Sequence, residues 1–186
     1  MELSDRTKYI LKEWIEPIVT AIILALILRA FIIQAYKIPT GSMEPTLHGD
    51  PKHGDKIMVF KPIYWFREPK RGEIIVFKYP IEPKKNFIKR FIAGENEEVQ
   101  IKNGNIFINN EIIEDPEIFK QLYYYSQGDY GQTEEPIIVP EDSYYVLGDN
   151  SAHSKDSRIW GFVPKKNLVG KAILIWWPPS RIGLIK

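Results

Sequence analysis

Residues 87–108, FIKRFIAGENEEVQIKNGNIFI, decide the fold class of this chain. An apolar run is followed by a polar turn at 94–97 and then by two short alternating segments on either side of Asn103-Gly104. An Asn-Gly pair between alternating apolar segments is the strongest short-range signal for a β-hairpin. The stretch therefore predicts three strands, over 87–93, 99–102 and 105–108.

The same sequence pattern continues on both sides of this stretch. Short apolar runs separated by Gly, Pro and Asn predict further strands over 56–61, 73–78, 144–147 and 171–176. Amphipathic helices of useful length do not stand out after residue 36. Because so many short strands leave edges that must be covered, we expect a mostly β domain with a folded-over or closed antiparallel sheet.

Residues 109–140 differ from their surroundings. They are acidic and contain the run Tyr123-Tyr124-Tyr125, several glycines and three prolines. Loops of this length inside a compact domain are uncommon unless they form a unit of their own. We predict an inserted smaller subdomain over this range.

The segment 17–36, PIVTAIILALILRAFIIQAY, predicts a membrane anchor. Twenty helical residues span about 30 Å, the thickness of a bilayer hydrocarbon core, and the apolar residues surround the whole helix. Arg29 is close enough to the end of the segment for its guanidinium to reach the interface. A cleaved secretory signal is the alternative, but no closely spaced pair of small residues follows the apolar run. We therefore predict one uncleaved transmembrane helix at 17–36.

Charged residues near the N-terminus predict the orientation of this anchor. Arg6, Lys8 and Lys12 precede the apolar segment, which favours an N-terminus on the inner side of the membrane. Residues 1–16 are then a cytoplasmic tail, and residues 37–186 form an extracytoplasmic domain that is long enough to have its own core.

The overall composition excludes several classes of protein. The chain has 25 Lys+Arg against 24 Asp+Glu, so it is not a strongly basic nucleic-acid binder. It has no cysteine, which excludes thiol catalysis and disulfide scaffolds. The triplet HGD occurs at 48–50 and again at 53–55, and His and Asp are competent metal ligands. Two glycine turns on a polar loop are the simpler interpretation, and we expect no metal.

Two residues outside the anchor suggest nucleophilic chemistry. Ser42 stands in a loop bracketed by Pro39 and Pro45, and a serine becomes a good nucleophile only when a base takes its proton. None of the three histidines lies in an apolar strand. Lys89 does, and burial lowers the pKa of a lysine so that its neutral amine can act as a base. A Ser–Lys dyad is one interpretation, and a lysine that extends to solvent is the commoner one.

Several motifs of the chain resemble those of the type I signal peptidases (leader peptidases). The resemblance covers residues 17 to about 183, and the order and spacing of the motifs match. The motifs are the serine loop Gly41-Ser42-Met43, the turn Phe77-Lys78-Tyr79-Pro80, the run Ile88-Lys89-Arg90, the triplet Gly148-Asp149-Asn150, and the segment 154–164, SKDSRIWGFVP.

The resemblance assigns roles to particular residues. It implies Ser42 as nucleophile and Lys89 as general base, with Ser154 orienting the lysine amine. It implies that the Thr40 hydroxyl joins the backbone N–H of Ser42 in an oxyanion hole. The remaining positions are the supporting residues Asp149, Asp156 and Arg158 and the apolar walls of substrate pockets, Ile38, Pro39, Met43, Val76 and Ile88.

The resemblance also implies an activity and a location. We expect a membrane-bound serine endopeptidase that removes signal peptides from exported preproteins after small residues, at sites of the Ala-x-Ala type. It is expected to be a single-pass monomer of the bacterial inner or plasma membrane, with its catalytic domain outside. Its partners are preproteins and the lipid bilayer, without cofactor or nucleic acid. Ser42 lies at most about 20 Å beyond residue 36, which holds the chemistry at the membrane surface.

Two segments depart from the family pattern. After Gly148-Asp149-Asn150 the family usually has R-D-N, and this chain has Ser151-Ala152-His153. The usual L-P-G-D turn after the lysine strand is replaced by residues 94–97, GENE. Contributions from the missing side chains are therefore not expected here.

Two other functions fit part of the pattern. The SOS-repressor autoproteases also use a Ser–Lys dyad on a related β domain, but they are soluble and carry a DNA-binding module, which the predicted anchor disfavours. A membrane-tethered β domain that only binds a partner is the second alternative, with Ser42 and Lys89 incidental.

Overall fold

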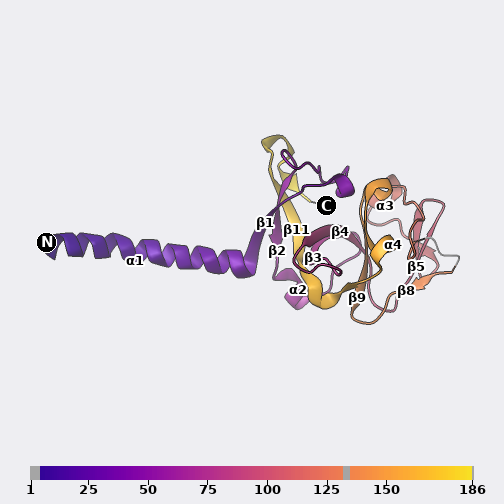
Figure 1. Ribbon diagram of the computed structural model, residues 1–186, viewed down its shortest axis with the longest axis horizontal. Helices are drawn as coiled ribbons and strands as arrows, with labels where there is room; N and C mark the ends of the chain where they lie inside the picture. Colours follow the sequence, from indigo (N-terminus) through magenta and orange to yellow (C-terminus); the bar gives the residue numbers. More distant parts are fainter. Residues whose placement is uncertain (1–4, 132–134, 186) are drawn as a thin grey trace.

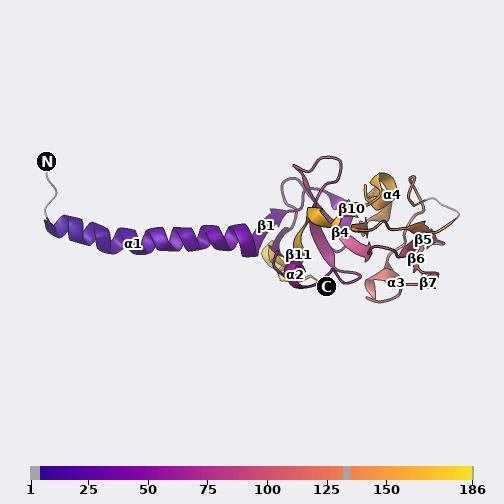
Figure 2. The same ribbon diagram turned by 90° about the horizontal axis from the view of Figure 1, so that it is seen from below.

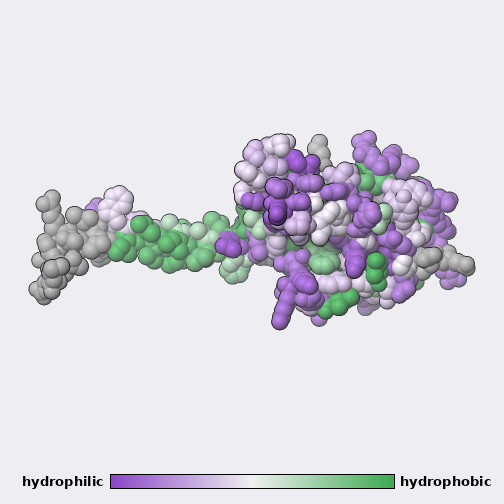
Figure 3. All heavy atoms as spheres, turned by 45° about the horizontal axis from the view of Figure 1, so that its top comes forward, coloured by the Kyte–Doolittle hydropathy of each residue, from purple (hydrophilic) through white to green (hydrophobic). Residues whose placement is uncertain are grey.

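The computed structural model describes residues 5–131 and 135–185, and it consists of one long helix attached to a β domain (Figure 1). Helix α1 (Asp5–Ile27) continues into a π-helical turn, η1 (Leu28–Ile32). Within the described residues, the segment Glu13–Ile32 is the one helix long and apolar enough to cross a membrane, and none of it is buried. Figure 3 shows this segment as a hydrophobic rod that projects from a mostly polar domain.

The helix joins the sheet without a linker. Strand β1 (Ile33–Lys37) begins at the residue after η1, so residues 33–36 of the predicted segment 17–36 belong to a strand. β1 pairs with β2 (Lys56–Phe60) along its whole length. Lys61 reinforces the joint, because its backbone N–H donates to the Ile32 carbonyl at 3.0 Å and its Nζ donates to the Ala30 carbonyl at 2.8 Å.

The main sheet is antiparallel throughout, with the strand order β1-β2-β11-β3-β4-β9-β10 and β12 paired with β11. Register shifts interrupt the pairing of β11 with both of its neighbours and of β4 with β9. Such bulges increase twist, and here they accompany a sheet curled into a half-barrel. The expected folded-over antiparallel domain is confirmed. Its other strands are β3 (Ile74–Lys78), β4 (Asn86–Ala93), β9 (Ser143–Leu147), β10 (Val163–Pro164), β11 (Leu168–Trp177) and β12 (Gly183–Leu184).

A second, smaller sheet lies at the end of the domain opposite α1 (Figures 1 and 2). Its strand order is β7-β6-β5-β8. The predicted hairpin is present, and Asn103 and Gly104 both have positive φ angles, as a type I′ turn requires. The small sheet begins at Glu98, before the predicted inserted range 109–140. Its strands are β5 (Glu98–Lys102), β6 (Asn105–Ile108), β7 (Glu111–Ile112) and β8 (Ile137–Ile138).

After α1, the α-helices of the described residues are single turns. They are α2 (Ile63–Phe66), α3 (Ile118–Gln121) and α4 (Ser157–Trp160). Buried side chains instead form three clusters, one of which lies between the two sheets. The cluster that concerns the site contains Ile38, Met43, Leu47, Ile57, Val59, Ile74, Val76, Ala172 and Ile175.

Candidate active site

Ser42 lies in a single 3₁₀ turn, Gly41–Met43, that follows strand β1. The Met43 side chain is fully buried in the apolar cluster and anchors the turn from below. Asn150 holds it from the side, because its backbone N–H donates to the Ser42 carbonyl at 3.1 Å and its Nδ2 donates to the Gly41 carbonyl at 3.0 Å. The serine is therefore fixed by packing and by two hydrogen bonds from a distant segment.

Strand β4 brings Lys89 to the same place. Its side chain is buried, its Nζ lies 2.6 Å from Ser42 Oγ, and Nζ also donates to the Ile88 carbonyl at 3.0 Å. Lys89 does not extend to solvent, which was the commoner interpretation of a lysine in an apolar strand. Residues 47 positions apart in the chain thus share one hydrogen bond.

The surroundings of Lys89 favour its neutral form. Burial lowers the pKa of Lys89 to about 8, because water no longer solvates the ammonium ion. The negative charges of Asp156 and Asp149 raise this pKa again, and the positive charge of Arg158 lowers it. The desolvation effect is the largest, so the amine is partly neutral near neutral pH.

Two buried ion pairs flank the dyad. Arg90 follows Lys89 on β4, and its Nε and Nη2 donate to the two carboxylate oxygens of Asp149 at 2.8 and 2.6 Å. Thr46 Oγ1 donates to the same carboxylate at 2.5 Å. The Arg90 and Asp149 side chains are fully buried, so each charge depends on the other for stabilisation. The sequence motifs alone assign no role to Arg90. Its position directly after Lys89 in an apolar strand is a signal that could have predicted a buried charge in need of a carboxylate partner.

The second pair, Asp156–Arg158, is buried as well and is not a surface contact. Arg158 Nε and Nη2 donate to the Asp156 carboxylate at 2.8 and 2.7 Å, and Asp156 Oδ2 accepts the Gly148 N–H at 3.0 Å. Ser151 takes part in this network, since its Oγ accepts from Arg158 Nη1 at 2.6 Å and from the Tyr125 N–H at 2.8 Å. Ser151 therefore ties the inserted range to the site.

Thr40 and Ser154 lie beside the dyad without a direct bond to it. Thr40 is exposed and has an extended backbone. Ser154 is buried, and within the described residues its Oγ has no hydrogen-bond partner, so the expected bond to Lys89 is not formed. Gly148 explains the close packing here, because a Cβ at that position would lie 2.1 Å from Ser154 Oγ and 2.4 Å from the Ser42 carbonyl oxygen.

Most of the expected pocket walls lie together. Ile38, Met43 and Val76 are buried in one apolar cluster, and Ile88 packs against it half-buried. Pro39 is exposed at the edge of the serine loop. The predicted pocket residues therefore come from two parts of the chain. One is the segment that carries Ser42, and the other is the pair of strands β3 and β4, of which β4 carries Lys89.

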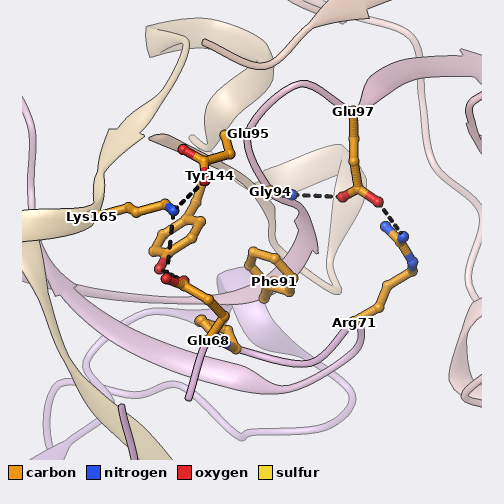
Figure 4. Close-up of a pocket in the computed structure, with 9 residues that line it drawn as sticks. Glu68, Arg71, Phe91, Gly94, Glu95, Glu97, Tyr144 and Lys165 are labelled. Atoms are coloured by element: carbon orange, nitrogen blue, oxygen red, sulfur yellow. Dashed lines mark hydrogen bonds and ion pairs between the residues drawn. The ribbon is translucent and has the colours of Figure 1, made fainter. Parts of the chain in front are cut away.

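A separate pocket of 280 Å³ contains none of the predicted site residues (Figure 4). It lies at the turn 94–97, where Glu97 binds Arg71 at 2.7 Å and Glu95 binds Lys165 at 2.8 Å. Glu97 also accepts the Gly94 N–H at 2.7 Å, which closes the turn. The GENE segment is thus fixed by ion pairs to the main sheet, and it has no contact with the dyad that the structure records.

The two HGD triplets form turns. Asp50 accepts the N–H groups of Lys52 and His53 at 2.7 and 2.5 Å, and the buried Asp55 pairs with Arg181 at 2.9 Å. Across residues 5–131 and 135–185, no group of three His, Asp or Glu side chains is arranged to hold a metal ion.

Comparisons with known proteins identify the family. The family model described as "Signal peptidase, peptidase S26" matches residues 11–177. The probable signal peptidase I-2 of Synechocystis sp. is 40% identical over 181 residues, covering 92% of this chain and 77% of the relative. The signal peptidase I of Bacillus licheniformis is 32% identical over 97% of this chain and 96% of its own length. The thylakoidal processing peptidase 1 of Arabidopsis thaliana chloroplasts is 32% identical over 88% of this chain and 48% of its own length.

These matches confirm the resemblance on which the sequence interpretation depended. They set aside both alternatives, the SOS-repressor autoprotease and the tethered binding domain. The chain belongs to the signal peptidase I family, peptidase S26, and is a serine endopeptidase that removes signal peptides from preproteins.

Proposed function

We propose that Ser42 is the nucleophile of this peptidase and that Lys89 is its general base. The observation that carries the proposal is the 2.6 Å contact between Lys89 Nζ and Ser42 Oγ, made by a buried lysine with a lowered pKa. The neutral amine takes the Ser42 proton as Oγ attacks the scissile carbonyl carbon. The ammonium then protonates the leaving amine, and the same amine activates the water that hydrolyses the acyl-enzyme.

The oxyanion is stabilised by the backbone N–H of Ser42 and the hydroxyl of Thr40. Thr40 lies two residues before the nucleophile on an extended, exposed segment, where its hydroxyl is free to turn toward bound substrate. A donor of this kind typically contributes about 2.7–4 kcal/mol to catalysis. Ser154, with its unpartnered buried hydroxyl, orients the lysine amine when the substrate is in place.

Asp149, Asp156 and Arg158 act through their charges and their packing. Both carboxylates raise the pKa of Lys89, and Arg158 lowers it. The two ion pairs therefore adjust how readily the Lys89 amine takes up and releases a proton. The apolar walls Ile38, Pro39, Met43, Val76 and Ile88 accept the small residues that precede the cut.

The apolar helix anchors the enzyme in a membrane, with the residues that precede Glu13 on the cytoplasmic side and the β domain outside. The span is the segment Glu13–Ile32, slightly earlier than 17–36, because β1 starts at Ile33. The location that we propose is the bacterial inner or plasma membrane, and relatives include cyanobacterial and thylakoidal peptidases. The enzyme acts as a monomer, since the nucleophile and the base come from one chain.

Cleavage of a preprotein in detergent by matched variants tests the dyad. Ser42→Ala and Lys89→Ala should each lower kcat by at least about a thousandfold, because the nucleophile and its base act as one unit and removing either residue disables both. His48→Ala is the control, since His48 is the histidine nearest to Ser42 in sequence and pairs with Glu44 at 3.1 Å. Folded dyad variants that still cut the preprotein, or a His48→Ala variant that does not, would show the assignment to be wrong.

A further inference from the structure

A hollow of 400 Å³ borders the serine loop and shares no residue with the apolar pocket walls. Its walls come from three segments of the chain: Glu44 and Pro45, residues 149–152, and the two tyrosines Tyr123 and Tyr125. The tyrosines belong to the inserted range, whose contacts the sequence did not predict. The hollow thus lies between the main sheet domain and the small-sheet subdomain.

Two observations place this hollow next to the nucleophile. Asn150, one of its lining residues, donates hydrogen bonds to the carbonyls of Gly41 and Ser42. The Glu44 carboxyl group folds back over the same turn, so that a Cβ on Gly41 would lie 3.2 Å from Glu44 Cδ. A polypeptide bound in the hollow would therefore lie next to the turn that holds Ser42.

The apolar walls and the hollow are lined by different residues around the serine turn. Ile38, Met43 and Val76 pack with residues of β2 and β11 and with Tyr36 of β1, the strand that continues the anchor helix. The hollow contains no residue of that cluster, and Tyr123 and Tyr125 of the subdomain line part of it. Figures 1 and 2 show this subdomain at the end of the molecule farthest from α1.

This arrangement gives the substrate a direction. The apolar segment of a signal peptide lies in the same bilayer as the anchor, so the residues before the cut approach from the anchor side. The residues after the cut must then leave on the far side of Ser42. We propose that the hollow binds the first residues of the mature protein, on the carboxyl side of the scissile bond. The proposal rests on Ser42 being the nucleophile.

The chemistry of the hollow suits an extended polypeptide. The rings of Tyr123 and Tyr125 lie 4.9 Å apart in an edge-to-face arrangement, and their side chains are 59% and 51% exposed. Exposed aromatic faces of this kind bind main chain and side chains at low entropic cost.

Asp149 is neutralised by Arg90. Glu44 contacts His48 Nδ1 at 3.1 Å and the Gly49 N–H at 3.3 Å, and no lysine or arginine of the described residues pairs with it, so its charge is the one that faces the bound chain. The hollow should therefore disfavour acidic residues directly after the cut.

The test compares two substrates that are identical up to the scissile bond. The long substrate continues with the mature sequence, and the short one ends there as a methyl ester. For the full-length enzyme in detergent, the double variant Tyr123→Ala/Tyr125→Ala should lower the ratio of kcat/KM for the long substrate over that for the ester by about two- to tenfold. Ile138→Ala, an exposed residue of the same small sheet outside the hollow, should leave the ratio unchanged. An unchanged ratio in the tyrosine variant would overturn the proposal.

A charge variant gives an independent result. Long substrates with Ser-Ser or Asp-Asp after the cut should differ in kcat/KM by about two- to fivefold in wild type, and Glu44→Gln should reduce that preference. A preference that Glu44→Gln leaves intact would contradict the role of the carboxylate. Failure of the underlying assignment looks different: Ser42→Ala would then still hydrolyse both the long substrate and the ester.

Discussion

Replacing Lys89 by methionine should stabilise the enzyme while it abolishes cleavage. Lys89 is buried, and its pKa falls from an ordinary value of 10.5 to about 8 in the folded state. The unfolded chain therefore binds a proton between these two pH values that the folded chain does not bind. Because each pKa unit corresponds to 1.36 kcal/mol, the shift lowers the free energy of unfolding by about 3 kcal/mol.

The sign of the effect gives the prediction its pH window. The penalty is fully present below pH 8, where both states carry the proton, and it fades as pH rises to 10.5. Methionine fills a similar volume and carries no charge, so Lys89→Met escapes the penalty. Its advantage in unfolding free energy over wild type should be largest at pH 7 and should shrink by about 3 kcal/mol toward pH 10.5.

Urea unfolding of the full-length chain in detergent, followed by tryptophan fluorescence at several pH values, measures this difference. Ser42→Ala is the matched control, because it is inactive but keeps the lysine and should follow the wild-type pH trend. A difference between Lys89→Met and wild type that stays constant from pH 7 to 10.5 would refute the reasoning.

Three further predictions follow from the site. Preprotein cleavage should rise about tenfold per pH unit from pH 6 and level off above about pH 8, as Lys89 loses its proton; a rise confined to pH values near 10 in a pH–rate profile would contradict this. Asn150→Ala should lower kcat by about tenfold or more with little change in KM, since it frees the serine turn; steady-state kinetics that show only a KM effect would argue against it. Asp149→Ala leaves the buried Arg90 charge without its carboxylate, although Arg90 still donates to the Gly72 carbonyl, and should cost about 3–5 kcal/mol in a urea unfolding experiment, where a loss below about 1 kcal/mol would count against the pair.

Local sequence patterns predicted most of the strands. The Asn103-Gly104 turn and the alternating segments on either side of it produced β5 and β6 where they were expected. Strand β1 was missed for a physical reason: its residues continue the apolar run of the helix, and apolarity alone does not show where helical hydrogen bonding ends. The two-residue strands β7, β8, β10 and β12 are too short to show a period.

The site was only partly predictable. The apolar neighbours of Lys89 indicated its burial, but its contact with Ser42 depends on the pairing of β3 with β4 and on the packing of Met43, which no local pattern encodes. The hydrogen bonds from Asn150 to the serine turn were also missed, because they join segments 109 positions apart. Composition predicted an inserted range at 109–140, but no local pattern encodes the contact between this range and the site through Ser151.

Helix α1 continues through η1 into strand β1 without a flexible linker, and this junction affects which preproteins the enzyme can process. Lys61 stabilises this junction by binding backbone carbonyls on the helix side, and with the proposed membrane anchoring we expect it to hold Ser42 at a constant distance from the lipid. With the proposed anchoring, we expect a preprotein to be cut most efficiently when the distance from its own apolar segment to its cleavage site matches that distance. Inserting a few flexible residues between Ile32 and Ile33 should let Ser42 move relative to the membrane. The enzyme should then cut preproteins with a wider range of distances between the apolar segment and the cleavage site.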